Sequence, residues 1–205
     1  MNSGKNMTEE VTLKWSDLKA SLQESDKKEL INLLHDLYNN STENCRYITA
    51  RYAKTDNESK ILEAYRKKVI NVYYPPRGAA SRPRYSVAKK AINDYSDASG
   101  NIKGTMDLVL TLEENIMKYL HEFSGIDKLS YVGGLEMIEI FCELARTEEG
   151  RKLYPYFKER LQILYMDSED IPYGICGNLC YYIFNLVGDI SDPDDDFFEE
   201  DLQDN

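Results

Sequence analysis

Residues 105–123, TMDLVLTLEENIMKYLHEF, place large apolar side chains at the spacing that puts them on one face of a helix. The members of this apolar set are Val109, Leu112, Ile116, Leu120 and Phe123. Gly125 follows two residues later, and glycine commonly stands just after the last turn of a helix. The stretch therefore predicts a long helix with one apolar face, and it favours an all-α fold class.

The same spacing continues on both sides of this stretch. Asp26 and Glu29 have the separation of a capping box, and a leucine stripe follows them at Leu30, Leu33, Leu34 and Leu37. A helix that starts near Asp56 is expected to stop before Pro75 and Pro76, because proline cannot continue the hydrogen-bond ladder. We expect nine helical segments, which start near Ser16, Asp26, Ser41, Asp56, Ser86, Thr105, Ser130, Lys152 and Ile175.

The chain of 205 residues shows no convincing strand alternation and is long enough to bury its own core. We predict an all-α single domain of about eight or nine helices, an irregular bundle or stack, over residues 13–188. Residues 1–12 are predicted to be disordered, and residues 189–205 to form a disordered acidic tail. A loop rich in proline and arginine, at about residues 75–85, is the one long loop expected inside the domain.

The net charge of −11 argues against a protein that coats nucleic acid over its whole surface. The charge is unevenly distributed, however. Residues 66–90 hold eight basic side chains and no acid, whereas residues 189–205 hold nine acids and no base. This segregation is the compositional feature that most calls for a functional explanation.

The basic segment interleaves aromatic rings with cations, a composition used to grip phosphates and to stack on unpaired bases. The residues predicted for nucleic-acid contact are Arg66, Lys67, Lys68, Tyr74, Tyr85, Lys89 and Lys90. Arg77, Arg82 and Arg84 of the loop are predicted to make electrostatic contacts with a partner. The alternative is a solvated loop whose arginines pair with acids elsewhere in the chain.

The acidic tail carries three large apolar residues, Phe197, Phe198 and Leu202. Phe198 and Leu202 would share a face if the tail became helical, so these three are predicted to anchor a partner protein. There are two alternatives: the tail serves only to increase solubility, or it folds back on the basic loop.

Motifs for chemistry are few. Neither His35 nor His121 has a glutamate three residues before it, and the pair Cys176 and Cys180 lacks the spacing of structural zinc sites. No phosphate-binding glycine loop is readable. We therefore predict no metal, no cofactor, no small-molecule substrate and no enzymatic activity. Two alternative enzymatic hypotheses remain open, a reactive Cys45 and a carboxylate site at Glu136 and Glu139.

The sequence also resembles a family of uncharacterised bacterial proteins known only as a domain of unknown function. The segments that carry this resemblance, over roughly residues 13–185, are SDLKASL, KKELINLLHDLY, NCRYITARY, EAYRKKVINVYYPP, AKKAINDY and DIPYGI. Around Pro172, Tyr173 and Gly174 the family pattern has bulkier aromatic residues. The resemblance implies an α-helical bacterial protein and supplies no activity.

These observations favour a non-enzymatic helical interaction protein, an accessory or regulatory subunit that binds another protein. The alternative is a nucleic-acid-binding module that acts through residues 66–90 and is screened by the acidic tail. With no apolar run of about 18–20 residues and no secretory signal, we expect a cytoplasmic protein without a membrane partner.

Overall fold

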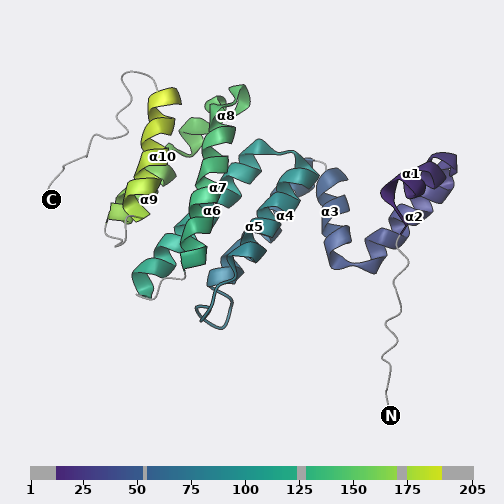
Figure 1. Cartoon of the computed structure of the whole chain (residues 1–205), viewed down its shortest axis with the longest axis horizontal. Helices are drawn as coiled ribbons and strands as arrows, with labels where there is room; N and C mark the ends of the chain where they lie inside the picture. The colour runs from purple at the N-terminus through teal and green to yellow at the C-terminus, as the bar shows by residue number, and fades with distance from the viewer. Residues whose placement is uncertain (1–12, 53–54, 124–127, 170–174, 191–205) are drawn as a thin grey trace, which may run out of the picture. The chain divides into compact units, whose positions relative to one another are not determined.

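The computed structural model describes residues 13–52, 55–123, 128–169 and 175–190, with side chains for all of these except 55–57, 128–133, 169 and 175–177. Within those residues the fold is all-α, as predicted (Figure 1). By contacts the chain divides into two units, residues 1–48 and 49–205, which are described separately. The expected anchors Phe197, Phe198 and Leu202, the predicted disorder of residues 1–12, and the tail from residue 191 lie outside the described residues.

The first unit contains α1 (Trp15–Glu24), α2 (Lys27–Asn40) and the start of α3 (Thr42–Tyr52). The capping box predicted for α2 is present: the Glu29 amide donates to Asp26 Oδ1 at 2.8 Å, and the Asp26 amide donates to Glu29 Oε2 at 2.9 Å. This reciprocal pair satisfies two of the free amides at the start of α2, which fixes where the helix begins.

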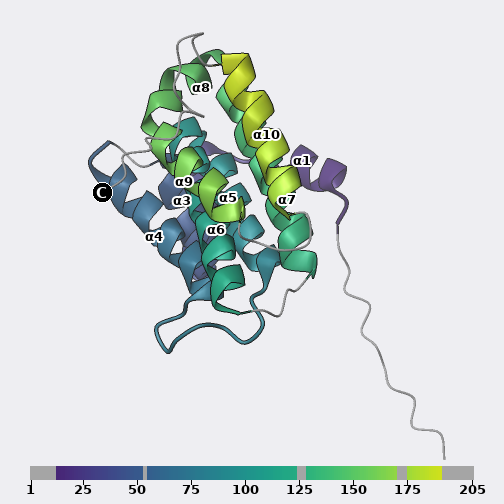
Figure 2. The ribbon, with the colours of Figure 1, turned by 90° about the vertical axis from the view of Figure 1, so that its left-hand side faces the viewer.

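The second unit is built around α6 (Ile102–Glu122), which packs against α4, α5, α7, α8 and α9. The elements around it are α4 (Thr55–Tyr73), α5 (Tyr85–Ser99), α7 (Lys128–Arg146), α8 (Glu148–Leu153), α9 (Lys158–Glu169) and α10 (Ile175–Ile190). α10 lies against both α7 and α9, and Figure 2 shows it at one side of this unit. Val109, Leu112 and Ile116 of α6 are buried, which confirms most of the apolar face expected for residues 105–123. Leu120 is half-buried, and the expectation was wrong for Phe123, which follows the last turn of α6 and is 39% exposed.

Helix ends follow local sequence in most places. α4 stops at Tyr73, directly before the prolines, and Gly100 closes α5 in the left-handed conformation at φ +63°. The Asn101 side chain then accepts from the Gly104 amide at 2.8 Å and caps α6. These two caps explain how only Gly100 and Asn101 suffice to connect α5 to α6.

One expected helix is divided in two. We predicted a single helix that starts at Lys152, but α8 ends at Leu153, and a short 3₁₀ turn (Tyr154–Tyr156) separates it from α9. Pro155 explains the break, since it has no amide hydrogen to continue the ladder. The described chain accordingly holds ten α-helices.

Candidate functional site

Half of the cations in the basic segment lie beside carboxylates of the same chain. Arg66 pairs with Glu63 and Asp107, and Lys89 pairs with Glu136. Lys67 lies 3.9 Å from Glu63, and Lys90 lies 2.8 Å from Asp94. Four of the eight cations in the basic segment therefore already have a carboxylate neighbour, which reduces the positive potential that they present to a ligand.

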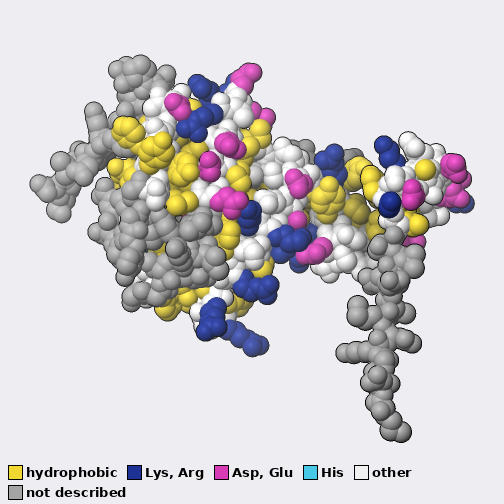
Figure 3. Space-filling model, in the orientation of Figure 1, with side chains coloured by type: hydrophobic (Ala, Val, Ile, Leu, Met, Phe, Trp, Pro, Cys, Tyr) yellow, Lys and Arg dark blue, Asp and Glu magenta, His cyan; other side chains and the backbone are white. Residues whose placement is uncertain are grey.

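The other four cations, Lys68, Arg77, Arg82 and Arg84, make no ion pair with the described residues. Lys68 is half-buried, and the three arginines are exposed on the loop between α4 and α5. In Figure 3, Lys and Arg side chains gather over this loop. The structure therefore brings the three predicted loop contacts to one exposed segment.

The loop that carries these arginines is held by several contacts. The Ala80 amide donates to the Tyr73 carbonyl at 2.8 Å, and the Tyr119 hydroxyl donates to the Ala80 carbonyl at 2.8 Å. Gly78 adopts φ +109°, a conformation that side chains rarely allow, and Pro83 is buried. The arginines thus project from a backbone that is already ordered, which lowers the entropy cost of binding.

The two tyrosines expected to stack on bases are engaged elsewhere. The Tyr74 hydroxyl donates to Glu122 at 3.0 Å, while the Lys118 ammonium lies 4.5 Å from the centre of the Tyr74 ring. The Tyr85 hydroxyl is buried without a hydrogen-bond partner among the described residues. Burial raises the pKa of both hydroxyls, with Glu122 adding to the effect at Tyr74 and Glu136 at Tyr85. Both rings are half-buried, so neither is a free platform.

A charged network that the sequence did not reveal links three helices. Asp107 of α6 accepts from Arg66 of α4 and from Arg160 of α9, the latter at 2.8 Å. Arg160 also donates to both oxygens of Glu114, at 2.6 and 2.9 Å. The side chains of Asp107, Arg66 and Arg160 are 17, 30 and 28% exposed, so the network is partly shielded from water. These charge-assisted hydrogen bonds join α4, α6 and α9, so we interpret the network as structural.

Glu113 is the residue that sequence reasoning missed. It is 2% exposed, and its Oε1 atom has no hydrogen-bond partner among the described residues. Burial raises its pKa to about 8, so the carboxyl group is mostly protonated at pH 7. The sequence does hold one indication that Glu113 is buried. It falls four residues after Val109 and three before Ile116, which places it on the apolar face of the helix.

The cysteines and histidines do not converge. Cys142 is buried, and this burial raises the pKa of its thiol to about 12. The ring of His121 lies 2.9 Å from the Asp167 carbonyl, whereas His35 contacts Asn39. Cys45 is half-buried on α3. In the part of the chain that the structure describes, no three His, Cys, Asp or Glu side chains are grouped to hold a metal ion.

A group of exposed apolar side chains lies on α1 and α2 and just before α1. Neither helix has a buried residue. The exposed large apolar residues here are Leu13, Trp15, Leu18, Ile31, Leu33, Leu34, Leu37 and Tyr38. The leucine stripe predicted for α2 is therefore present as spacing, but within the described chain it does not become part of a core.

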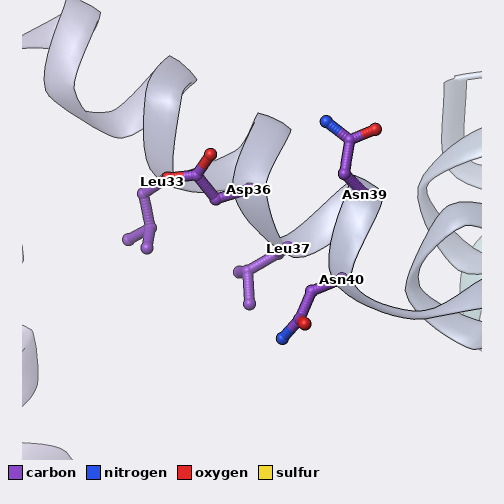
Figure 4. Close-up of a pocket in the computed structure, with 5 residues that line it drawn as sticks. All are labelled: Leu33, Asp36, Leu37, Asn39 and Asn40. Carbon is purple, nitrogen blue, oxygen red and sulfur yellow. The ribbon is translucent and has the colours of Figure 1, made fainter.

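A shallow groove of about 370 Å³ runs along α2. It is lined by Leu33, Asp36, Leu37, Asn39 and Asn40. Leu33 and Leu37 project from one side of the helix, one turn apart (Figure 4). The lining thus combines two leucines with three polar side chains, and the leucines lie along one edge of it.

A second group of exposed apolar side chains lies on α9 and α10. Ile163 and Met166 of α9 are 50 and 62% exposed, and Tyr181 and Phe184 of α10 are 66 and 60% exposed. α10 extends to Ile190, beyond the start of the tail predicted at residue 189, and Asp189 accepts from Arg146 Nε at 2.7 Å. This pairing with α7 explains why the helix continues past Gly188.

None of the described helices combines the length and the apolar character needed to cross a bilayer. No family model, curated protein or solved structure matches the chain. The resemblance to a bacterial domain of unknown function stays a prediction.

Proposed function

We propose that this chain is a non-enzymatic helical interaction protein, an accessory or regulatory subunit that binds another protein. The observation that carries the proposal is the apolar surface of α1 and α2, in which no side chain is buried. Isolated helices shorter than about 12–15 residues are marginal in water, and α1 and α2 have 10 and 14 residues. A partner that covers their apolar side chains would supply the missing stabilisation.

The non-enzymatic part of the proposal rests on what the titratable side chains do. Glu136, from the alternative carboxylate site, is engaged by Lys89, and Arg160 is engaged by Asp107 and Glu114. Glu113 is enclosed by the core. These groups serve packing and charge balance. The proposed bacterial origin is supported by the sequence resemblance, and a cytoplasmic location is part of the same proposal.

The test compares affinity capture by three tagged full-length chains from a bacterial lysate that also contains an untagged copy of the chain. These are the unaltered protein, the double variant Leu34→Gln and Leu37→Gln, and the control Asn32→Gln on the opposite side of α2. Leu34 and Leu37 are 48 and 41% exposed, so their replacement does not touch a core. The proposal expects proteins that the unaltered chain and the control retain and the double variant loses. Equal capture by all three would contradict it.

The alternative function is nucleic-acid binding, which is favoured by one specific observation. Arg77, Arg82 and Arg84 are exposed on an ordered loop and make no ion pair with described residues. Three phosphate contacts predict a slope of about −3 for the logarithm of affinity against the logarithm of salt concentration.

Fluorescence anisotropy with labelled single- and double-stranded DNA and RNA tests this alternative. Replacement of the three loop arginines by glutamine should abolish binding, whereas Lys152→Gln on α8, whose side chain is 71% exposed, should leave it unchanged. Absence of binding by the unaltered chain at low salt would remove this alternative.

A further inference from the structure

We propose that the apolar surface of α1 and α2 docks against the same surface of a second copy of this chain. This inference rests on the proposed function and names the partner of that same surface. The two helices of each copy would then supply a four-helix interface, in which each apolar side chain gains the cover that its own chain does not provide.

The width of the apolar face on α2 favours more than one partner helix. Leu30, Leu33 and Leu37 recur at intervals of three and four residues, and Ile31, Leu34 and Tyr38 repeat the pattern one position later. Together they occupy nearly half of the helix circumference, which is wider than the narrow seam of a two-stranded coiled coil. A face of this width is typical of a helix that packs in a bundle.

α1 supplies a second and narrower face. Trp15, Leu18 and Leu22 fall at positions i, i+3 and i+7, and Trp15 is 68% exposed. Only Ser25 and Asp26 separate α1 from α2. Because neither helix has a buried residue, both faces remain open to a partner. With α1 and α2 from each of two copies, the interface would contain four helices, as in a four-helix bundle.

The charge of this region permits self-association. Residues 13–40 contain four lysines and five acids, a net charge of −1, whereas the whole chain carries −11. In a two-fold symmetric interface each surface meets itself, so a strongly charged surface would repel its copy. The mixed, nearly neutral charge here avoids that repulsion. It also lacks the basic excess that an amphipathic helix uses to bind an anionic membrane.

The exposed apolar area is of the right order for a dimer. The exposed fractions run from 38% for Leu18 to 70% for Leu13, over eight large side chains that include a tryptophan. Together they expose several hundred Å² of apolar surface, which approaches the contribution of about 800 Å² per partner in a standard interface. Tryptophan and tyrosine are also the residue types that most often dominate binding energy.

Sedimentation equilibrium of the full chain over a wide range of protein concentration tests the proposal. The unaltered chain should pass from the mass of one copy to twice that mass as concentration rises. The double variant Leu34→Gln and Leu37→Gln should raise the dissociation constant about tenfold or more. Asn32→Gln, which places the same amide on the polar side of α2, should leave the constant unchanged.

Two results would overturn the proposal. A chain that stays monomeric at every concentration excludes the second copy as partner, and the capture experiment then decides whether the proposed function still stands. A dimer whose dissociation constant is unchanged in the double variant places the interface elsewhere. The melting temperature of each variant, followed by circular dichroism, shows that the second unit remains folded and keeps the comparison valid.

Discussion

Gly134 of α7 lies so close to Glu113 of α6 that a Cβ atom at position 134 would stand 2.8 Å from Glu113 Oε2. The same Cβ atom would stand 3.2 Å from Ile116 Cδ1. The buried carboxyl group therefore occupies space that only a glycine on the facing helix leaves open. This relationship explains how an acidic side chain is accommodated on the apolar face of α6.

Gly134→Ala should destabilise the protein. The added methyl group has no space unless Glu113 or Ile116 shifts, and overpacking of this kind costs about 1–3 kcal/mol. Urea unfolding measures the change in the free energy of unfolding. Gly188→Ala is the matched control, because its Cβ would meet nothing within 4 Å and alanine favours a helix by about 1 kcal/mol over glycine. Equal effects of the two substitutions would contradict the close approach.

Glu113 should make the protein less stable as pH rises. Its pKa is raised from 4.5 to about 8 in the folded state, so the unfolded chain releases the proton first. Its stabilising contribution is complete below about pH 4.5 and is lost progressively up to about pH 8, by an amount on the order of 5 kcal/mol.

Glu113→Gln should remove this pH dependence, because the amide does not titrate. Urea unfolding at pH 5, 6.5 and 8 gives the free energies to compare. The difference between the unaltered chain and the variant should change in favour of the variant as pH increases. A difference that stays constant over this range would show that Glu113 is not buried in its protonated form.

Asp107→Asn should lower the free energy of unfolding by about 2 kcal/mol. The asparagine cannot accept charge-assisted hydrogen bonds from both Arg66 and Arg160, and each such bond contributes about 1.5–3 kcal/mol where water is partly excluded. Glu148→Gln is the control, because the exposed pair of Glu148 with Lys152 should contribute less than about 1 kcal/mol. If both variants lose the same free energy of unfolding, the network of Asp107, Arg66 and Arg160 stabilises the fold no more than an exposed ion pair does.

Asp26→Ala should loosen the start of α2 without affecting the second unit. Removal of the capping side chain costs about 1 kcal/mol of helix stability. Amide hydrogen exchange should accelerate in residues 27–40 and stay unchanged in α6. Unchanged exchange in α2 would mean that the capping box does not hold the helix in solution.

Much of the fold was predictable because helix ends depend on neighbouring residues. The capping box at Asp26 and Glu29 and the stop before Pro75 act within a few residues, so the sequence shows them directly. Pro155 acts equally locally, and the division between α8 and α9 was missed because the apolar spacing was followed across it.

The candidate site was less predictable because it depends on long-range contacts. Neither the pairing of Arg66 with Asp107 nor that of Lys89 with Glu136 follows from composition, since the partners lie on different helices. Both pairs reduce the charge that the basic segment presents. Spacing also revealed the leucine face of α2, but spacing cannot tell whether the rest of the chain covers that face.

The central claim is that a second copy covers the apolar face of α2. Amide hydrogen exchange of the full chain at low and high protein concentration tests it most directly. We expect protection of residues 27–40 to increase with concentration, while protection of residues 102–122 in α6 stays constant. Protection of residues 27–40 that does not change with concentration would contradict the account.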